Sequence, residues 1–489
     1  MEEPKLSNDV FEQIKDFDHE RLTKEQSLLI DKLILNEELK ERYKKIGLCK
    51  ECKQPKVSPL WCQLCNAKYC QQNFKNWTSG NNEVDKFIQK KQLEADNPDT
   101  ILEWIEYDRF ENVEYLAKGG FGNIYKAIWK DGYIKEWDFE NNKWKRVKLL
   151  DCNNYSVALK CLYNSRDITT EFLREVGLHT ALCSGTSRIY LCHGITKDPG
   201  SNDFMMVMPY ARNGSLRQYL NNSFSSIIWS KKVHILRRTA EGLNNIHKKE
   251  LIHRDFHSGN ILCGLNYTTR ITDLGLCRPA NAKPSQDEYK EIYGVLPYVA
   301  PEVLIGKEYT KESDIYGFGI IAYEVCTGLP PYHDVAHDNL LAISICQGLR
   351  PKCDYKIPQL ILDLIKQCWD ADPLKRPKAN ELYNLLNRLY GELVDESDDD
   401  KIIYEISKQI REANKINEKL TTSSSLYTGT TLSYITNPQA VYTSRLLDFK
   451  NLPEPKNIID NKDNDNSFVG YSESIKSIDF TKLNIDKSD

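Results

Sequence analysis

The spacing of hydrophobic and polar positions changes character several times along the 489 residues of the chain. From about Ile105 to Leu393, apolar residues come first in short runs of strand length and then at the three- and four-residue spacing of helices. Strands followed by helices predict an α+β domain with two lobes, in which a β-rich lobe precedes an α-rich lobe. We therefore assign residues 105–393 to one globular domain.

The segments before this domain are shorter and more polar. Residues 1–46 carry an apolar stripe that predicts one or two helices, formed by Leu28, Leu29, Leu33, Leu39 and Tyr43. Residues 47–80 are rich in cysteine, and residues 81–104 predict a connecting helix over 82–95 that ends before Pro98. The chain thus places a small cysteine-rich module and a helix ahead of the larger domain.

The segments after the domain differ from it in composition. Residues 394–420 combine an acidic break with an amphipathic helix over 401–420, which we expect to pack on its own domain rather than to form a dimer seam. Residues 421–489 are rich in Ser, Thr, Asn, Asp and Lys, which predicts disorder. Within them, Tyr442–Phe449 could be a docking segment or only an apolar patch.

Overall composition narrows the class of protein. The chain is 40% hydrophobic and 28% charged, and its net charge of −4 does not indicate the overall positive charge that favours binding to nucleic acid. We see no signal peptide, no lipidation pattern and no apolar run near the roughly 20 residues that span a bilayer. These features predict a cytoplasmic protein, with the nucleus not excluded, that has no membrane or nucleic-acid partner.

The 15 cysteines are not spread evenly. Cys49 and Cys52 form one C-x-x-C pair, and Cys62 and Cys65 form another close behind it. Two such pairs can hold a tetrahedral zinc ion through four thiolates, so we predict a structural or protein-binding zinc module. Cys70 could replace one ligand, and the alternative interpretation is a group of free thiols near a helix.

Two segments of the β-rich lobe could handle phosphate. Leu116–Tyr125 lies between strand-like runs, and Gly119 and Gly122 would let the backbone fold tightly over phosphate groups. Lys160 ends a buried run, where its charge needs a partner such as a phosphate or Glu175 on the next predicted helix. Taken singly, an ordinary hairpin and a surface lysine explain these segments equally well.

The segment His253–Leu262 carries the strongest signal. It contains Asp255 and Asn260, and Asp273 follows in an Asp-Leu-Gly sequence. One acid can orient an attacking hydroxyl and accept its proton, while the other acid and the amide hold Mg²⁺ through oxygen ligands. This combination predicts phosphate-transfer chemistry.

The order of these motifs, completed by Ala300-Pro-Glu302, resembles the signature of eukaryotic protein kinases, and among them the tyrosine-kinase-like group. The resemblance covers residues 105–393. It implies a two-lobed kinase fold and an enzyme that moves the γ-phosphate of ATP, with Mg²⁺ as cofactor, onto a protein hydroxyl. It favours serine or threonine as the acceptor. The cysteine-rich head before such a domain also looks like that of a group of fungal kinases.

The resemblance also implies residue roles. Asp255 would be the catalytic base, Lys160 would contact phosphates while Glu175 holds it, and Asn260 and Asp273 would bind Mg²⁺. Arg376 would pair with Glu302 in a stabilising role, and Phe204–Ala211 would form the hinge with Met208 as gatekeeper. The implied ATP-binding residues are Leu116, Gly119, Gly122, Ile124, Ala158, Lys160, Met208, Pro209, Ala211 and Leu262.

Several positions depart from the family pattern. Ala117 replaces the first glycine of the phosphate loop, and residues 131–152 are an insertion that we expect to be a solvated hairpin, with a partner-binding loop as the alternative. His257 and Val295 differ from the residues that usually indicate serine/threonine specificity at these positions. His257 could still donate a hydrogen bond to the transferred phosphate.

Regulation and rival functions remain open at this level. Ser285, Tyr289 and Tyr293 could accept phosphate from an upstream kinase, and Arg254 could pair with that phosphate. Constitutive activity is the competing interpretation. A pseudokinase would keep the fold as a binding module, but Lys160, Asp255 and Asp273 are all present. In a third interpretation, the zinc module is the functional part and the kinase domain controls or delivers it.

Overall fold

The computed structural model describes residues 5–120, 122–147, 155–162, 165, 168–183, 187–281, 291–352, 354–394, 401–423 and 434–457. The chain divides into two compact units. Unit 1 comprises Met1–Thr186 and Tyr190–Tyr210, and unit 2 comprises Ser187–Ile189 and Ala211–Asp489. Each unit is described by itself below.

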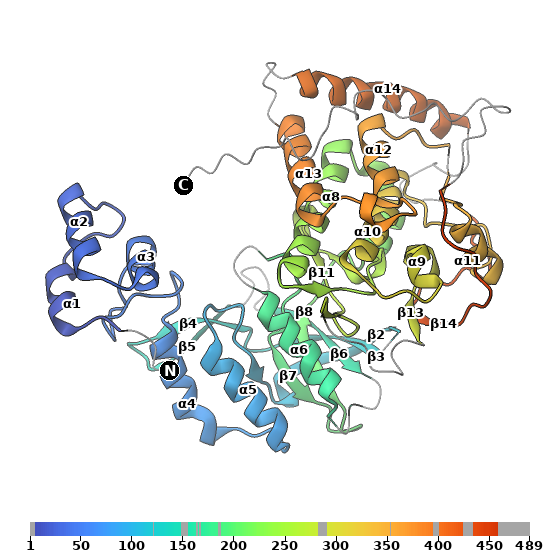
Figure 1. The fold of residues 1–489 in the computed structure, drawn as a ribbon. Coiled ribbons are helices and arrows are strands. Elements are labelled where there is room, and N and C mark those ends of the chain that lie inside the picture. The colour runs from blue at the N-terminus through green and yellow to red at the C-terminus, as the bar shows by residue number, and fades with distance from the viewer. Residues whose placement is uncertain are drawn as a thin grey trace. The chain divides into compact units, whose positions relative to one another are not determined.

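Unit 1 begins with a small helical subdomain (Figure 1). Its three helices are α1 (Asn8–Ile14), α2 (Lys24–Leu33) and α3 (Glu37–Ile46). Ser7, Thr23 and Asn36 accept hydrogen bonds from the first-turn N–H groups and so fix the three helix starts. The sequence predicted one or two helices and placed Leu28 on the apolar stripe, but Leu28 is 70% exposed and Ile30 is buried instead. The buried core comprises Leu6, Ile14, Ile30, Ile34, Leu39 and Tyr43.

The cysteine-rich module and the connecting helix follow. Cys62 precedes α4 (Gln63–Asn73), and Asn81 caps α5 (Asn82–Glu94), as predicted for residues 82–95. Trp61 is almost fully buried, and its indole N–H donates to the Ala95 carbonyl at 2.8 Å. This contact ties the cysteine-rich module to the far end of α5.

A six-stranded sheet forms the main body of unit 1, with the strand order β1-β7-β8-β6-β3-β2. Every neighbouring pair is antiparallel except β1 and β7. The strand β6 is central and nearly all apolar, which is why its residues Val157 and Leu159 are fully buried. The elements are β1 (Glu103–Trp104), β2 (Phe110–Lys118), β3 (Gly122–Trp129), β6 (Tyr155–Leu162), α6 (Thr170–Leu182), β7 (Gly194–Lys197) and β8 (Phe204–Pro209).

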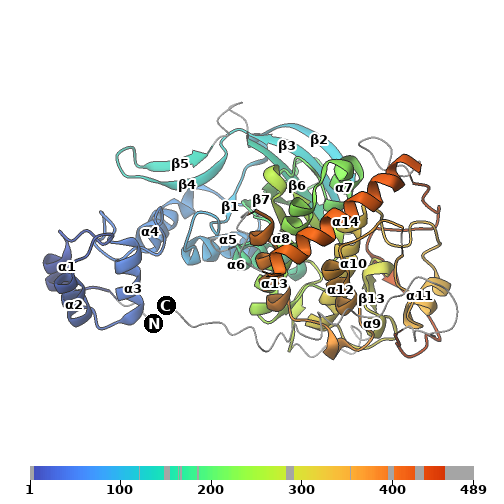
Figure 2. The same ribbon diagram turned by 90° about the horizontal axis from the view of Figure 1, so that it is seen from above.

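The insertion forms a hairpin of β4 (Tyr133–Asp138) and β5 (Lys143–Val147), which lies beside α4 in both ribbon views (Figures 1 and 2). The expectation of a solvated hairpin is wrong for its apolar face. The ring of Trp137 stacks on Tyr69 with centroids 4.1 Å apart, and Trp144 stacks on Trp61 at 5.8 Å. Ile134 is 3% exposed and shares a core with the cysteine-rich module. Aromatic burial therefore attaches the hairpin to that module.

Unit 2 is mainly helical, which confirms the predicted order of a β-rich and an α-rich lobe. Its central helix α10 is buried along nearly its whole length, including the side chains of Asp314 and Glu324. Its helices are α7 (Leu216–Ser223), α8 (Trp229–Lys248), α9 (Pro301–Leu304), α10 (Lys311–Thr327), α11 (Asn339–Cys346), α12 (Gln359–Cys368), α13 (Ala379–Val394) and α14 (Lys401–Ser423). Its short strands are β9 (Leu251–Ile252), β10 (Ile261–Cys263), β11 (Thr269–Ile271), β12 (Arg278–Pro279), β13 (Ile292–Gly294) and β14 (Arg445–Leu447).

The helix α14 packs on unit 2, as the sequence suggested for residues 401–420 (Figure 2). Ile406 and Ala413 are buried on its inner face. The indole N–H of Trp229 donates to Asn414 Oδ1 at 3.0 Å, and Asn417 exchanges two hydrogen bonds with the backbone of Lys356. The apolar face is therefore used within the chain.

The expected disorder after residue 421 does not hold for residues 434–457, which run over unit 2. Here β14 pairs antiparallel with β13 (Figure 1). Further along, the Lys456 N–H donates to the Cys346 carbonyl at 3.0 Å, and the Ala371 N–H donates to Asn457 Oδ1 at 2.9 Å. The acidic break at 395–400 and residues 424–433 and 458–489 lie outside the described residues.

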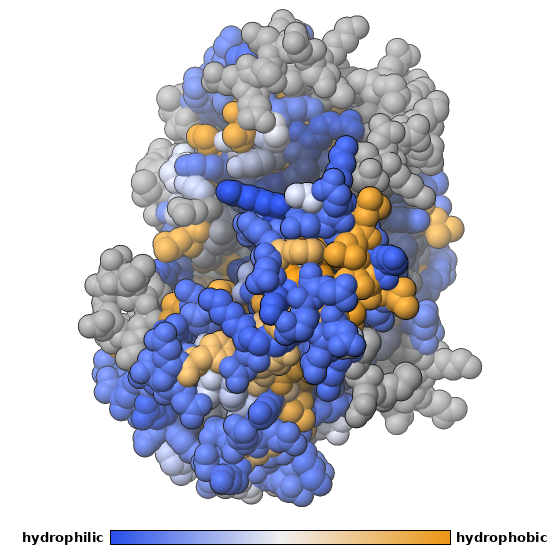
Figure 3. Space-filling view, turned by 90° about the vertical axis from the view of Figure 1, so that its left-hand side faces the viewer, coloured by the Kyte–Doolittle hydropathy of each residue, from blue (hydrophilic) through white to orange (hydrophobic). Residues whose placement is uncertain are grey.

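Most of the coloured surface in the view of Figure 3 is hydrophilic. Hydrophobic residues form one larger group right of the centre and several smaller groups elsewhere. In the part of the chain that the structure describes, no helix combines the length and hydrophobicity that crossing a membrane requires.

Candidate active site

In unit 1, the predicted lysine and glutamate meet. Lys160 lies on β6 and Glu175 lies on α6, and Lys160 Nζ is 2.7 Å from Glu175 Oε1. Both residues are buried, at 9% and 2% exposure, so each charge needs the other. The pair fixes a cationic nitrogen at the sheet, as contact with phosphate requires.

The predicted phosphate loop is the turn between β2 and β3. The Gly119 N–H donates to the Gly122 carbonyl at 2.7 Å and closes this turn. A Cβ at Gly122 would lie 2.0 Å from the carbonyl oxygen of Cys161 on β6. Glycine is therefore required here by the close approach of β6, a reason that the sequence did not reveal. Ala117 pairs with Ile124 in the ladder, and its methyl group is compatible with the strand.

The predicted hinge is the end of β8. Met208 is 4% exposed and pairs with Ala158 on β6. The Tyr210 N–H donates to the Ser156 carbonyl at 3.1 Å. Because successive residues of an extended chain point their polar groups to opposite sides, the Pro209 carbonyl and the Ala211 N–H face away from β6. Those are the two groups expected to recognise adenine. Of the other predicted ATP contacts, Leu116 and Ile124 lie on β2 and β3 in unit 1, and Leu262 lies on β10 in unit 2.

In unit 2, a buried carboxylate anchors the loop that carries Asp255. Asp314 accepts hydrogen bonds from the backbone N–H groups of His253, at 2.8 Å, and Arg254, at 3.0 Å. His247 Nε2 lies 2.9 Å from Asp314 Oδ2. Neither the anchoring of this loop by Asp314 nor the place of His247 beside it was predicted from the sequence. The anchor explains how Arg254 is held at a φ of 70°.

Asp255 and Asn260 are brought together as predicted. The Asn260 amide donates from Nδ2 to the Asp255 carbonyl at 3.0 Å and to Asp255 Oδ2 at 3.1 Å. Asp255 Oδ1 is buried and has no hydrogen-bond partner among the described residues. A buried carboxylate oxygen without a donor is costly, and the hydroxyl of a substrate would satisfy it.

His257 lies beside the base. Its Nδ1 accepts a hydrogen bond from the Gly259 N–H at 3.1 Å, so the ring proton lies on Nε2. Nε2 is 3.5 Å from Asp255 Oδ2, and the expected hydrogen bond from His257 to a transferred phosphate stays a prediction. Burial alone would raise the pKa of Asp255, but the neighbouring His257, with smaller effects from His253 and Asn260, holds that pKa below its ordinary value. The base is thereby kept ionised.

The two candidate magnesium ligands lie on linked loops. Asn260 precedes β10 and Asp273 follows β11, and the Thr272 N–H donates to the Asn260 carbonyl at 2.9 Å. The amide nitrogen of Asn260 is engaged by Asp255, which leaves its oxygen as the atom that could meet a metal. Carboxylate and amide oxygens are the ligands that Mg²⁺ prefers in proteins, so this pair of residues fits the ion.

Two further ion pairs stabilise unit 2. Arg376 binds Glu302 in a bidentate pair at 2.6 and 2.7 Å, as predicted. The second network was missed by the sequence, because its members share no local motif. Arg217 on α7 donates to the Tyr298 hydroxyl at 2.6 Å and to Glu324 at 3.2 Å. It places a cation, a ring and a carboxylate beside the loop of Asp255.

The activation segment, which lies between Asp273 and Glu302, is described only in part. Ser285 and Tyr289 lie outside the described residues, whereas Tyr293 is on β13 and its carbonyl accepts a hydrogen bond from the Tyr309 hydroxyl at 2.7 Å. The Arg254 guanidinium lies over the ring of Tyr309, 4.6 Å from its centroid. The expected pairing of Arg254 with a phosphate remains a prediction.

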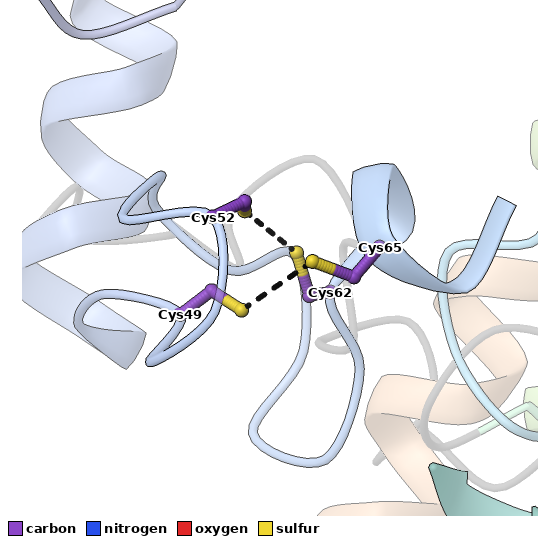
Figure 4. Close-up of side chains that lie close together, drawn as sticks. All are labelled: Cys49, Cys52, Cys62 and Cys65. Atoms are coloured by element: carbon purple, nitrogen blue, oxygen red, sulfur yellow. Dashed lines mark hydrogen bonds between the residues drawn. The ribbon is translucent and has the colours of Figure 1, made fainter. Parts of the chain in front are cut away.

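A second candidate site lies in the cysteine-rich module (Figure 4). The Sγ atoms of Cys49, Cys52, Cys62 and Cys65 all lie within 4.8 Å of one another, with Cys52 and Cys62 at 3.4 Å. Zinc–sulfur bonds of about 2.3 Å in a tetrahedron need sulfurs roughly 3.8 Å apart, so the four thiols fit the ion. Cys70 is not part of the group, since it is buried in a core with Trp61 and Ile134.

Comparison with known proteins agrees with this geometry. Residues 110–386 match the family described as protein tyrosine and serine/threonine kinase. A "probable serine/threonine-protein kinase" of Dictyostelium discoideum is 27% identical over 58% of this chain and 28% of that protein. The "probable serine/threonine-protein kinase roco5" of the same organism is 31% identical over 63% of this chain, which spans 10% of that relative. The "tyrosine-protein kinase SPK-1" of Girardia tigrina is 26% identical over 57% of this chain and 53% of its own length. The chain thus spans well under two thirds of each relative.

Proposed function

The chain belongs to the family of protein tyrosine and serine/threonine kinases, and we propose from this that it is an active kinase that phosphorylates protein hydroxyls with ATP. The observation that carries the proposal is the buried Asp255 Oδ1, which has no donor among the described residues. A pseudokinase has no need to hold an ionised base ready for a hydroxyl. The buried ion pair of Lys160 with Glu175 supports the same conclusion.

The proposed roles rest on the resemblance to protein kinases, and the contacts of several of the residues support them. Asp255 Oδ1 orients the acceptor hydroxyl and takes its proton, and His257 and Asn260 position the carboxylate from the side of Oδ2. Lys160, held by Glu175, binds the ATP phosphates. Asn260 and Asp273 hold Mg²⁺, which supplies positive charge to the phosphates when it is bound. The Pro209 carbonyl and the Ala211 N–H recognise adenine.

The acceptor is serine or threonine in this proposal. Two of the relatives above are described as serine/threonine kinases, and one is described as a tyrosine kinase. We place the chain in the tyrosine-kinase-like group on the strength of its Asp-Leu-Gly sequence and its cysteine-rich head, which resembles that of a group of fungal kinases. A cytoplasmic location, with the nucleus as the alternative, and control by an upstream kinase acting on the activation segment belong to the same proposal.

Zinc in this proposal is structural. Cys49, Cys52, Cys62 and Cys65 fill all four positions of a tetrahedral ion, which leaves no open position for a substrate. Trp61 precedes the third ligand directly and carries the stacking contact to the inserted hairpin. The ion would therefore hold the module in the shape that the hairpin packs on.

The proposal is tested by phosphate transfer. Purified protein is incubated with radiolabelled ATP and Mg²⁺ beside the Asp273→Asn variant, and labelled products are hydrolysed to phosphoamino acids. We expect phosphoserine or phosphothreonine in the wild type and none in the variant, which loses a magnesium ligand. Absence of label from both proteins and from generic substrates, with ATP still raising the melting temperature, would support a pseudokinase instead.

A further inference from the structure

Residues 434–457 follow the same face of unit 2 as the loop of Asp255. The Asn437 N–H donates to the His333 carbonyl at 2.8 Å, and the His337 N–H donates to the Gln439 carbonyl at 3.0 Å. Arg445 donates to the His337 carbonyl at 2.7 Å. The segment then forms β14 against β13 (Figure 1). An extended segment of the chain is thus held by backbone contacts, in the way that several peptide-binding domains hold a peptide by adding a strand.

The register of this pairing places the segment beside the base. Arg445 pairs with Gly294, and a Cβ at Gly294 would lie 3.8 Å from Asp255 Oδ1. Ser444 precedes Arg445, and its Oγ is buried without a hydrogen-bond partner among the described residues. Ser444 is therefore the neighbour of the residue whose ladder partner, Gly294, approaches Asp255 Oδ1, and the Ser444 Oγ and the Asp255 Oδ1 are both buried without a hydrogen-bond partner among the described residues.

Two side chains anchor the segment on either side of Ser444. The ring of Tyr442 lies under the Arg217 guanidinium, 4.0 Å from its centroid, and the Tyr442 hydroxyl donates to the Pro331 carbonyl at 2.9 Å. Leu447 is 4% exposed, whereas its neighbour Leu446 is 48% exposed. Because the Tyr442 hydroxyl is engaged and Thr443 is exposed, Ser444 is the hydroxyl of this segment that fits the base.

We propose that residues 442–447 bind to unit 2 as an intramolecular peptide substrate and that Ser444 is a phosphoacceptor of the chain's own kinase activity. The inference rests on the proposed function. Ser444 Oγ attacks the γ-phosphorus of ATP and forms the new O–P bond, and the bond from that phosphorus to the β–γ bridging oxygen breaks. ADP leaves with the electron pair, and the hydroxyl proton passes to Asp255.

Phosphorylation would also end the docking. A phosphoserine carries about −1.5 to −2 charge at neutral pH, and here it would stand beside the ionised Asp255. Repulsion between the two groups favours release of β14 from β13. The segment is therefore a substrate that leaves its site once it is modified, and the surface it leaves is open to other proteins.

The experiment uses the full chain with ATP and Mg²⁺, and myelin basic protein serves as an external substrate. Phosphopeptides are mapped by mass spectrometry, and initial rates are measured over a range of protein concentrations. We expect Ser444 to be modified at a rate per molecule that is independent of protein concentration, and Ser444→Ala to lose that phosphopeptide. Leu447→Asp buries a charge under β14 and should slow labelling of Ser444 about tenfold or more, whereas Leu446→Asp should leave it near wild type.

The other outcomes contradict either the docking of Ser444 or the proposed function. Label on myelin basic protein without label on Ser444 overturns the inference and leaves the proposed function standing. A per-molecule rate that rises with protein concentration, or equal labelling of Ser444 in Leu447→Asp, overturns docking in cis. Activity of the Leu447→Asp variant on myelin basic protein shows that it is folded, and Tyr442→Ala serves as the second variant. Absence of label from every substrate overturns the proposed function itself.

Discussion

Two segments that the sequence left unattached are docked in the structure, and they are docked by different forces. The inserted hairpin of unit 1 is held by stacked rings, by the buried Ile134 and by the ion pair of Arg146 with Glu103. The segment of residues 434–457 in unit 2 is held mainly by polar contacts, and Leu447 is the buried side chain of its strand.

The difference predicts different lifetimes for the two contacts. Full burial of a large apolar side chain stabilises by about 1.5–3 kcal/mol, whereas a hydrogen bond exchanged with water contributes about 0.5–1.5 kcal/mol. Several partly or fully buried rings make the hairpin a permanent part of its module. A short ladder with one buried leucine can open and close, as an intramolecular substrate must.

The largest expected effect is that of removing zinc from the cysteine-rich module. Chelation, or the Cys62→Ser variant, should unfold the module and expose Trp61, because structural zinc contributes on the order of 10 kcal/mol to small domains. Tryptophan fluorescence and a chromogenic zinc indicator follow both events. Cys70→Ala is the matched control, since it is buried in the same module but is not a ligand, and it should keep one zinc per chain. Full zinc content in Cys62→Ser would contradict the assignment.

The next effect concerns the rings of the hairpin. Trp144→Ala removes the ring that stacks on Trp61 and should lower the free energy of unfolding by about 2–3 kcal/mol, less than for a fully buried tryptophan. Phe139→Ala, in the same hairpin but 50% exposed, should cost under about 1 kcal/mol. Denaturant unfolding measures both values. Equal costs would mean that burial does not hold the hairpin.

A smaller effect should appear with pH. His193 is stacked on Tyr133 at the start of β4, and burial, with a smaller effect of Arg146, lowers the pKa of His193 to about 3. Unfolded histidine has a pKa near 6.5, so the unfolded state gains a proton first as pH falls. The stability is fully present above about pH 6.5 and is lost by up to about 1.4 kcal/mol per unit below it. Between pH 7 and 5, wild type should lose about 2 kcal/mol more than His193→Gln in urea unfolding; parallel losses would contradict this.

The smallest effect on stability is expected in unit 2. Leu447→Asp should change the global free energy of unfolding by less than about 1.5 kcal/mol, because its cost cannot exceed the free energy of docking a reversible segment. Hydrogen exchange should nevertheless show loss of protection at β13 and β14. Leu446→Asp is the control and should keep that protection. A large drop in global stability would make β14 a fixed structural strand and remove the contrast with the hairpin.

The sequence predicted those parts of the site that local motifs encode. The pairings of Lys160 with Glu175 and of Glu302 with Arg376 follow from short motifs, and the four zinc-ligand candidates follow from their spacing. The sequence also separated the β-rich from the α-rich part of the chain, because that distinction depends on local periodicity.

Contacts between distant residues could not be predicted in the same way. The stacking of Trp61 on Trp144 and the pairing of Arg445 with Gly294 join segments that lie far apart in the sequence and share no local pattern. The network of Arg217, Tyr298 and Glu324 likewise draws on three separate elements. The place of His257 beside Asp255 was not predicted, because the geometry of its loop, and not its residue type, decides which ring nitrogen faces Asp255.

The pairing of β14 with β13 has a consequence for how other proteins are recognised. A segment on the same polypeptide is present at its site at a millimolar effective concentration when a flexible connection joins the two. Any external peptide that pairs with β13 must compete with this segment of the same chain. If the segment is docked in about 90% of molecules, the apparent affinity for the external peptide falls about tenfold. The substrate concentration needed for binding therefore depends on residues 434–457 as much as on the substrate itself.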